Sequence, residues 1–315
     1  MNRTLIFGCG YVGARIARRL REDGWEAYAV TRSSERAEEW TRAGWQAIRA
    51  DVTQPETLAD LPEVDVLYFA VGYDPRGAAT RQQVYVDGLS NVLRAMTGRC
   101  GRVVAISSTS VYGQQHGEEV DEDSATTPAG ESGEVCLAAE RALWDWASGA
   151  GQGSATMLLR FAGLYGPGRL LARLDALHRG VTMPGRGDAW LNLIHAEDAA
   201  RLAIRCAERG RAGRTYLGSD QEPVRREEFY RQLAELAGAP PPAFDPDADG
   251  ARGSARGLNK RCNGSRTRDE LEFRFEFPTY REGLADALSA AAGVGPAATP
   301  PDPESAPPAA SQERP

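Results

Sequence analysis

A glycine-rich turn near the start of the chain constrains its fold more than any other feature. In the stretch LIFGCGYVGARIARRL, residues 5–20, Gly8, Gly10 and Gly13 separate a short apolar run from a helical pattern. A G-x-G-x-x-G turn between a strand and a helix is typical of a dinucleotide-binding βαβ unit. We therefore predict an α/β fold that binds a nucleotide at its first turn.

Each glycine has its own physical task in such a turn. Gly8 permits the sharp bend, Gly10 lets a diphosphate approach the backbone, and Gly13 allows close packing of helix on strand. The N–H groups at the start of the helix then hold the anion. The loop positions expected to bind the cofactor are Gly8, Gly10, Tyr11, Val12 and Gly13. A turn with a purely structural role is the alternative.

The first half of the chain alternates strand patterns with helix patterns. Strands are predicted over residues 4–7, 26–31, 46–49, 64–71, 102–107 and 155–161, and helices over 12–22, 33–43, 81–96 and 133–148. Alternation of this kind predicts a doubly wound parallel sheet, the Rossmann arrangement, with helices on both faces.

Beyond about Leu164 the alternation loosens, and glycine and proline cluster in YGPGR and MPGRGDAW. Helices are predicted there over residues 195–209, 225–236 and 280–291. We expect residues 1–164 to form the dinucleotide-binding domain and residues 165–294 to form mainly a smaller substrate lid domain. Residues 295–315, rich in proline and alanine, are predicted to be a disordered tail.

Composition narrows the class of protein. The 315 residues carry a net charge of −7, which argues against nucleic acid because phosphate binding needs a basic face. No apolar run reaches the roughly 18–20 residues of a membrane span, and the start of the chain does not resemble a signal peptide. The five cysteines are scattered without metal-ligand spacing. These features predict a cytoplasmic protein without a metal site.

The end of the second predicted strand distinguishes two cofactors. An NAD site usually has Asp or Glu there, accepting a hydrogen bond from the ribose 2′-hydroxyl. This chain has Thr31, followed by Arg32 and Ser33. A guanidinium with neighbouring hydroxyls suits a 2′-phosphate, so NADP is predicted ahead of NAD. The alternative is that Arg32 is a solvated surface cation.

The ends of the next two strands are expected to line the same cofactor. Asp51 lies after the third strand, next to Val52, where it could meet the adenine. The backbone of Ala70, Val71 and Gly72 ends the fourth strand. Ligands of open α/β sheets bind at this carboxyl edge.

Further motifs follow the glycine turn in a fixed order. They are ADV at 50–52, SSTSVYG at 107–113, LAAE at 137–140, LRFAGLYGPGR at 159–169, NLIHAEDAARL at 192–202 and NKR at 259–261. With this set, residues 3–288 resemble the extended short-chain dehydrogenase/reductase superfamily of NAD(P)-dependent epimerases and dehydratases. The resemblance implies a Rossmann fold, a nicotinamide cofactor and a small-molecule substrate. It leaves open a homodimer that packs the LAAE helix against its mate.

The resemblance also implies a catalytic Tyr in a YxxxK motif, whose pKa is lowered by the Lys. Aligning LAAE with the family pattern puts Ser132 and Cys136 at these two positions, and neither can do the usual work. The chain is thus similar to the atypical branch of the superfamily, in which the cofactor loop persists and the catalytic residues erode.

Three other residues are the catalytic candidates. The resemblance implies that Ser108, four residues before the tyrosine of this motif, hydrogen-bonds the reacting carbonyl or hydroxyl. Tyr112 would donate a proton; the alternative is the positioning role that the family normally gives this tyrosine. Asp87 would be a base if burial raised its pKa; its alternative is a carboxylate on a helix surface. Arg169, after YGPG, could meet an anionic substrate.

Three functions are consistent with these residues. The favoured one is an NAD(P)-dependent oxidoreductase or epimerase/dehydratase-like enzyme with an altered proton donor. The second is a non-catalytic NADP(H)-binding sensor or partner-binding protein. The third is a structural protein that has kept the fold without the nucleotide, which the intact glycine turn disfavours.

Overall fold

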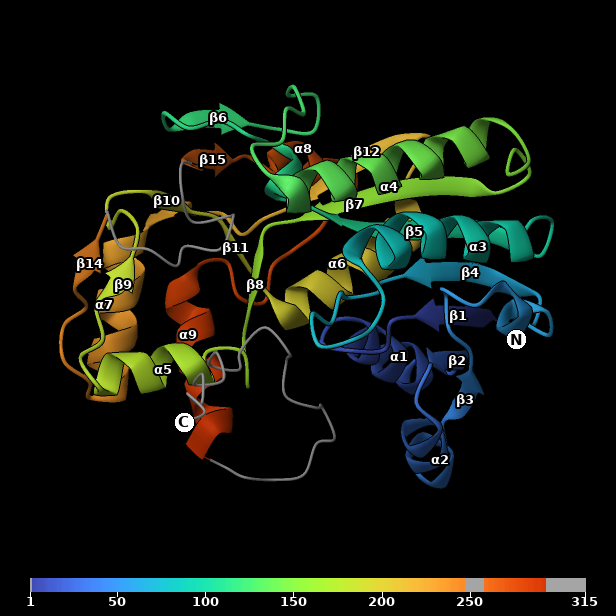
Figure 1. The fold of residues 1–315 in the computed structure, drawn as a ribbon, viewed down its shortest axis with the longest axis horizontal. Coiled ribbons are helices and arrows are strands. Elements are labelled where there is room, and N and C mark those ends of the chain that lie inside the picture. Colours follow the sequence, from blue (N-terminus) through green and yellow to red (C-terminus); the bar gives the residue numbers. More distant parts are fainter. Residues whose placement is uncertain (1, 247–257, 293–315) are drawn as a thin grey trace, which may run out of the picture.

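A seven-stranded parallel sheet forms the centre of the protein (Figure 1). The computed structural model describes residues 2–246 and 258–292. The strand order is β12-β7-β5-β4-β1-β2-β3, and every neighbouring pair is parallel. The strands are β1 (Arg3–Phe7), β2 (Glu26–Thr31), β3 (Gln46–Arg49), β4 (Val64–Phe69), β5 (Cys100–Ser108), β7 (Ala155–Phe161) and β12 (Arg214–Gly218). The predicted doubly wound α/β fold is confirmed.

Helices cover both faces of this sheet. The helices α1 (Gly13–Glu22), α2 (Ser34–Arg42) and α6 (Ala196–Arg209) contribute to one apolar core, and α3 (Gly88–Ala95) and α4 (Glu131–Ser148) to another. Alternate residues of β1 enter different cores: Ile6 joins the first, and Leu5 and Phe7 join the second. Burial on both faces explains why the central strands are continuous apolar runs.

The last strand of the sheet, β12, is absent from the sequence prediction. It pairs with β7, so that Leu217 lies opposite Arg160. The helix α6 packs against α1 on the same face of the sheet. Both β12 and α6 come after residue 164, yet they belong to the sheet and to the helices that cover it. A five-residue edge strand gives too short a period for sequence to separate it from a loop.

The predicted helix over residues 81–96 is a composite. A π-helical segment, η2 (Gln83–Asp87), precedes α3, which begins at Gly88. A Cβ atom at Gly88 would lie 2.7 Å from Cγ2 of Val52, so this glycine lets the helix approach the loop after β3. Such π-helical turns occur frequently at functional sites.

The remaining elements lie mostly beyond the carboxyl ends of the strands, at the left of Figure 1. Two-stranded ribbons pair β6 with β15, β8 with β11, β9 with β14 and β10 with β13. A third apolar core, which includes Tyr165, Phe229 and Leu284, lies between the helices of this region. The elements are η1 (Pro55–Leu58), η3 (Thr109–Val111), β6 (Glu118–Val120), β8 (Gly163–Tyr165), α5 (Leu171–His178), β9 (Met183–Pro184), β10 (Trp190–Leu191), β11 (Leu193–His195), β13 (Val224–Arg225), α7 (Arg226–Ala237), β14 (Phe244–Asp245), β15 (Lys260–Cys262), α8 (Ser265–Glu270) and α9 (Tyr280–Ala292).

Several predictions concern absences or the tail. Within residues 2–246 and 258–292, no helix is long and apolar enough to cross a membrane, and no cluster of His, Cys, Asp and Glu side chains could hold a metal ion. All five cysteines are buried thiols outside any disulfide. The predicted disordered tail, 295–315, lies outside the described residues.

Candidate functional site

The glycine turn after β1 is tight at two positions and open at the third. Gly8 has a φ of +82°, and a Cβ atom there would lie 2.4 Å from the carbonyl oxygen of Ala70. A Cβ at Gly13 would lie 2.3 Å from the carbonyl oxygen of Gly8. A Cβ at Gly10 would meet no heavy atom within 4 Å. The outer glycines are therefore required by packing, and the middle one leaves room for a ligand against the backbone.

The start of α1 lies directly behind this turn. Val12 precedes the helix, and no side chain caps it. The first backbone bond of the turn runs from the Gly10 N–H to the Gly8 carbonyl, 2.7 Å away. An uncapped helix N-terminus presents N–H donors and the positive end of the helix dipole to an anion. These residues fit the diphosphate of a nicotinamide dinucleotide.

The YGPGR loop lies over the same turn, although it is more than 150 residues away in sequence. The Tyr11 hydroxyl donates a hydrogen bond to the carbonyl oxygen of Pro167 at 3.2 Å. The guanidinium of Arg169 lies 5.0 Å from the centre of the Tyr11 ring. A Cβ at Gly166 would lie 2.9 Å from the Tyr11 hydroxyl oxygen, so glycine is needed where the two segments meet. Arg169, predicted to contact substrate, is thus next to the cofactor turn.

The end of β2 carries the residues predicted to select the cofactor. The Arg32 side chain is 53% exposed, and its Nη2 lies 3.5 Å from Oδ2 of Asp74. The Asp74 pKa is lowered, first by a hydrogen bond from the Arg76 backbone N–H and then by neighbouring cations. Ser33 caps α2 by accepting a hydrogen bond from Arg36 N, and Thr31 Oγ1 accepts one from Ser33 N. Arg32 therefore extends from an ordered turn into solvent.

Asp51 has a local role that the sequence prediction did not include. Its Oδ1 accepts hydrogen bonds from the N–H and the hydroxyl of Thr53, at 2.9 and 2.8 Å. This contact stabilises the turn after β3. The carbonyl oxygen of the next residue, Val52, accepts a bond from Asn91 Nδ2, which ties the turn to α3.

The end of β4 lies directly beside the glycine turn. The Ala70 N–H donates to the Phe7 carbonyl at 2.8 Å. Ala70 and Val71 are half-buried, whereas Gly72 is exposed. The backbone of residues 70–72 is therefore placed to line a ligand that lies along this edge.

Ser108 lies at the carboxyl end of β5, the neighbour of β4. Its Oγ accepts a hydrogen bond from Ser110 N at 3.1 Å and so begins η3. A Cβ at Gly133 would lie 2.3 Å from the Ser110 carbonyl oxygen, so α4 packs tightly on this turn. The same helix carries Ser132, half-buried, and Cys136, whose thiol pKa is raised by burial. A thiol with a raised pKa is a poor nucleophile.

The environment of Tyr112 does not favour the predicted proton donor. Tyr112 is completely buried, and its hydroxyl oxygen accepts a hydrogen bond from Arg160 Nη1 at 2.8 Å. Arg160 in turn forms a buried ion pair with Glu140 at 2.7 Å. Burial raises the pKa of Tyr112 to about 12. The hydroxyl therefore faces a buried charge pair. The three residues lie in separate motifs, so the spacing within a motif does not reveal this contact.

The environment of Asp87 contradicts the burial that a base at this position requires. Asp87 is exposed at the last position of η2, immediately before Gly88. The alternative, a carboxylate on a helix surface, agrees with this placement.

Three side chains that the sequence analysis did not single out also gather at this edge. Arg81 lies over the ring of Tyr73, with 4.5 Å between the guanidinium carbon and the ring centre. The Tyr85 hydroxyl accepts a hydrogen bond from Tyr73 N at 3.1 Å. Tyr73 follows the fourth strand and Arg81 and Tyr85 belong to the predicted helix, so no spacing in the sequence signals that the three meet.

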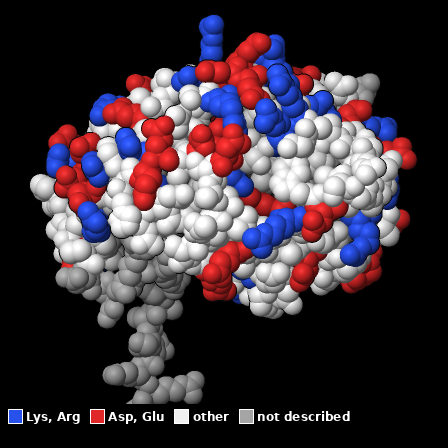
Figure 2. Space-filling view, turned by 90° about the horizontal axis from the view of Figure 1, so that it is seen from above, with Lys and Arg blue, Asp and Glu red and all other residues white. Residues whose placement is uncertain are grey.

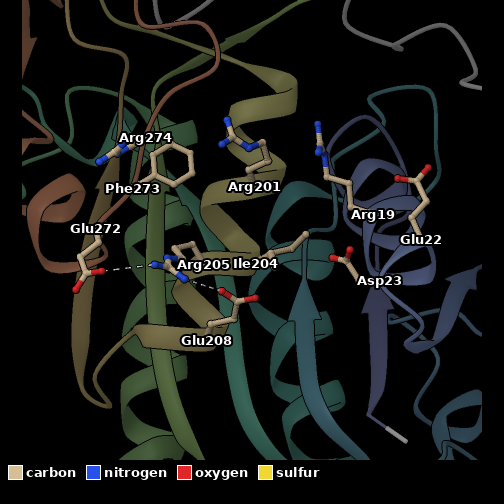
Figure 3. Close-up of a pocket in the computed structure, with 10 residues that line it drawn as sticks. All are labelled: Arg19, Glu22, Asp23, Arg201, Ile204, Arg205, Glu208, Glu272, Phe273 and Arg274. Atoms are coloured by element: carbon tan, nitrogen blue, oxygen red, sulfur yellow. Dashed lines mark hydrogen bonds and ion pairs between the residues drawn. The ribbon is translucent and has the colours of Figure 1, made fainter.

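Two surface hollows lie away from the glycine turn. The first, of about 410 Å³, lies between α1 and α6 (Figure 3). Arg19, Arg201 and Arg205 line it, and each is already paired with a carboxylate. Figure 2 likewise shows acidic and basic side chains interspersed over the face seen from above. Compensated charges of this kind offer no particular affinity for a dinucleotide.

The second hollow, of about 290 Å³, contains a buried carboxyl group at the end of β12. Asp220 is 4% exposed, and its Oδ1 accepts a hydrogen bond from Glu222 N at 3.3 Å. Burial, with the nearby carboxylates of Glu222 and Glu282, raises the pKa of Asp220 to about 8. The group is therefore mostly protonated at neutral pH.

Known proteins match both the sequence and the fold. Residues 4–217 match the NAD dependent epimerase/dehydratase family. Protein YeeZ from Escherichia coli K12 is 29% identical over 283 residues, covering 88% of this chain and 97% of its own.

Solved structures extend the comparison. A putative NAD-dependent epimerase/dehydratase from Methylobacillus flagellatus is 32% identical, with a TM-score of 0.73 over 93% of this chain and 99% of its own. The dTDP-glucose 4,6-dehydratase DesIV from Streptomyces venezuelae, solved with NAD bound, shares the fold at 20% identity, with a TM-score of 0.78 over 92% and 96% of the two chains. This chain belongs to the NAD dependent epimerase/dehydratase family.

Proposed function

We propose that this protein is an NAD(P)-dependent oxidoreductase or epimerase/dehydratase-like enzyme that acts on a small molecule without the family's usual Tyr/Lys pair. The observation that carries the proposal is the glycine turn, tight at Gly8 and Gly13 and open at Gly10. An open middle position before an uncapped helix has no use in packing, but it serves a bound diphosphate.

The chain's own residues divide the remaining tasks. A bound nicotinamide would supply or accept the hydride. The N–H groups at the start of α1 hold the diphosphate, and the backbone of residues 70–72 lines the cofactor. Ser108 orients the reacting carbonyl or hydroxyl from the end of β5, and Arg169 attracts an anionic part of the substrate.

For the cofactor we propose NADP ahead of NAD. Arg32 is exposed and directly follows the carboxyl end of β2, the strand end at which this fold distinguishes a 2′-hydroxyl from a 2′-phosphate. Its contact with Asp74 is long and solvent-exposed, so a 2′-phosphate can replace that carboxylate at small cost.

A titration followed by a turnover assay tests the proposal. Calorimetric titration with NADPH and NADH should give saturable binding, tighter for NADPH. The absorbance of the reduced nicotinamide should then fall when one compound from a panel of aldehydes, ketones and nucleotide sugars is added, and should stay constant without it. If neither NADPH nor NADH binds, the proposal is contradicted.

A second candidate is a non-catalytic NADP(H)-binding sensor. It is supported by Ser132 and Cys136 at the positions of the family's Tyr and Lys, and by the burial of Tyr112. Binding without turnover of any compound, together with a dinucleotide-dependent change in the affinity for a partner protein, would favour it.

A further inference from the structure

Cys136 of α4 stands where the family has its lysine, and the positive charge of Arg81 acts on this position. The charge of Arg81 acts to lower the pKa of this thiol, against the larger opposite effect of burial. Arg81 comes from a different element, the segment that leads into η2. Arg81 therefore places a positive charge near Cys136 from a different segment of the chain.

The guanidinium of Arg81 lies beside the rings of two tyrosines. Its guanidinium carbon lies 4.5 Å from the ring centre of Tyr73 and 5.9 Å from that of Tyr85. The Tyr73 N–H donates to the Tyr85 hydroxyl oxygen at 3.1 Å. We call these three residues the Tyr73–Arg81–Tyr85 cluster.

The cluster lies at the carboxyl edge, where the candidate site is. Tyr73 directly follows Gly72, at the end of β4, and β4 pairs with β5, which ends at Ser108. Tyr85 packs against the small apolar core that contains Val111 of η3 and Cys136 of α4. The π-helical segment that carries Tyr85 contacts α4 along this side. Tyr85 is therefore close to both elements on which the family places its catalytic groups.

We propose that Tyr85 is the proton donor and acceptor of this enzyme, and that Arg81 supplies the positive charge of the family lysine. This inference rests on the function proposed above. In the reducing direction a bound reduced nicotinamide would supply the hydride to the carbonyl carbon. The electron pair of the C=O bond moves to oxygen, which takes the phenolic proton of Tyr85. The phenolate keeps the electron pair of the broken O–H bond and regains a proton from water.

The surroundings of Tyr85 suit this task better than those of Tyr112. The Tyr73 N–H donates to the oxygen on which the negative charge would develop, and the Arg81 cation lies beside both rings. Both effects stabilise a phenolate. Tyr85 is half-buried, whereas Tyr112 is enclosed by the protein and bound to a cation already neutralised by Glu140.

Turnover of three variants tests the assignment. Tyr85→Phe should lower kcat at least about 100-fold, the usual contribution of a general acid, with the dinucleotide Kd and the melting temperature little changed. Arg81→Ala should also lower kcat, and Arg81→Lys should restore most of it. Tyr28→Phe, which removes a half-buried hydroxyl bonded to Glu26 on β2, is the matched control and should keep turnover. Full turnover in folded Tyr85→Phe would overturn the assignment and leave the proposed function intact.

Chemical modification gives a readout that does not depend on turnover. Tetranitromethane should nitrate Tyr85 of the wild-type protein, as mapped by mass spectrometry, and saturating NADPH should slow this reaction several-fold. Tyr28, whose hydroxyl contacts Glu26, is the internal control, and NADPH should not change its rate of nitration. Equal nitration of Tyr85 with and without bound NADPH would contradict its placement at the site, even in a protein that turns over nothing.

Discussion

The glycine turn and the β5–α4 region lie at the same edge of one sheet, yet they differ in what they have kept. The turn keeps a close approach at Gly8 and Gly13 and an open position at Gly10. Recognition of a diphosphate in such turns uses backbone N–H groups and the space left by missing side chains. The β5–α4 region has Ser132 and Cys136 where a phenol and an ammonium are usual. Proton transfer depends on particular side-chain pKa values, so a change of two residues removes the family's usual donor. Binding built from backbone is more resistant to substitution than chemistry built from side chains.

The buried ion pair between Glu140 of α4 and Arg160 of the neighbouring strand β7 should give the largest effect. Glu140→Ala leaves the Arg160 guanidinium buried without its carboxylate, and we expect it to lower the free energy of unfolding by about 3–5 kcal/mol. Urea denaturation followed by circular dichroism measures this loss. Arg186→Ala breaks an exposed ion pair with Asp188 and should change stability far less. Equal losses for the two variants would mean that this buried ion pair does not support the fold.

The glycine turn should show the opposite behaviour, losing the ligand and keeping the fold. Gly10→Val adds a side chain where no heavy atom lies within 4 Å, so the melting temperature should hardly change. The same side chain occupies the space of the diphosphate, and the Kd for the dinucleotide should rise roughly 100-fold, about 2.7 kcal/mol.

The control for this change is another open glycine. Gly153 also has no heavy atom within 4 Å of its Cβ position, and it lies in the loop before β7, at the amino edge of the sheet. Gly153→Val should leave both the melting temperature and the Kd unchanged. Wild-type affinity in Gly10→Val would remove the main support for a diphosphate at this turn.

A pH-dependent effect should appear at the end of β12. Asp220 has a folded pKa of about 8, above its unfolded value near 4, so its contribution to stability is complete below pH 4 and is lost as the pH rises toward 8. Asp220→Asn cannot ionise and keeps an oxygen for the Glu222 N–H. It should be more stable than the wild type at pH 8 and equal to it at pH 4, with the difference growing as the pH rises between these values. Urea denaturation at the two pH values measures the difference, and a difference independent of pH would contradict the assignment.

The smallest effect concerns the choice of cofactor. Arg32→Ala should reduce the preference for NADPH over NADH about tenfold, because one exposed charge-assisted contact is lost. Arg42→Ala, an exposed arginine at the end of α2, is the matched control and should leave the ratio unchanged. Equal weakening of both dinucleotides by Arg32→Ala would assign Arg32 a general electrostatic role.

The sequence alone was sufficient for six of the seven strands of the sheet, for the helices that cover it and for the glycine turn. Continuous apolar runs, helical periodicity and the spacing of glycines are local properties of neighbouring residues. The outer glycines needed no tertiary information, because only glycine permits the bend at Gly8 and the close approach at Gly13.

Tertiary structure decided everything that depends on where a side chain points. It placed β12 at the sheet edge, directed the Tyr112 hydroxyl toward Arg160, and left Asp87 exposed. It also brought Tyr73, Arg81 and Tyr85 together. Each of these outcomes depends on packing between segments far apart in the chain or on an irregular helical turn. Spacing within a motif carries no information about such partners, whereas the backbone conformation of a turn is fixed by the residues that form it.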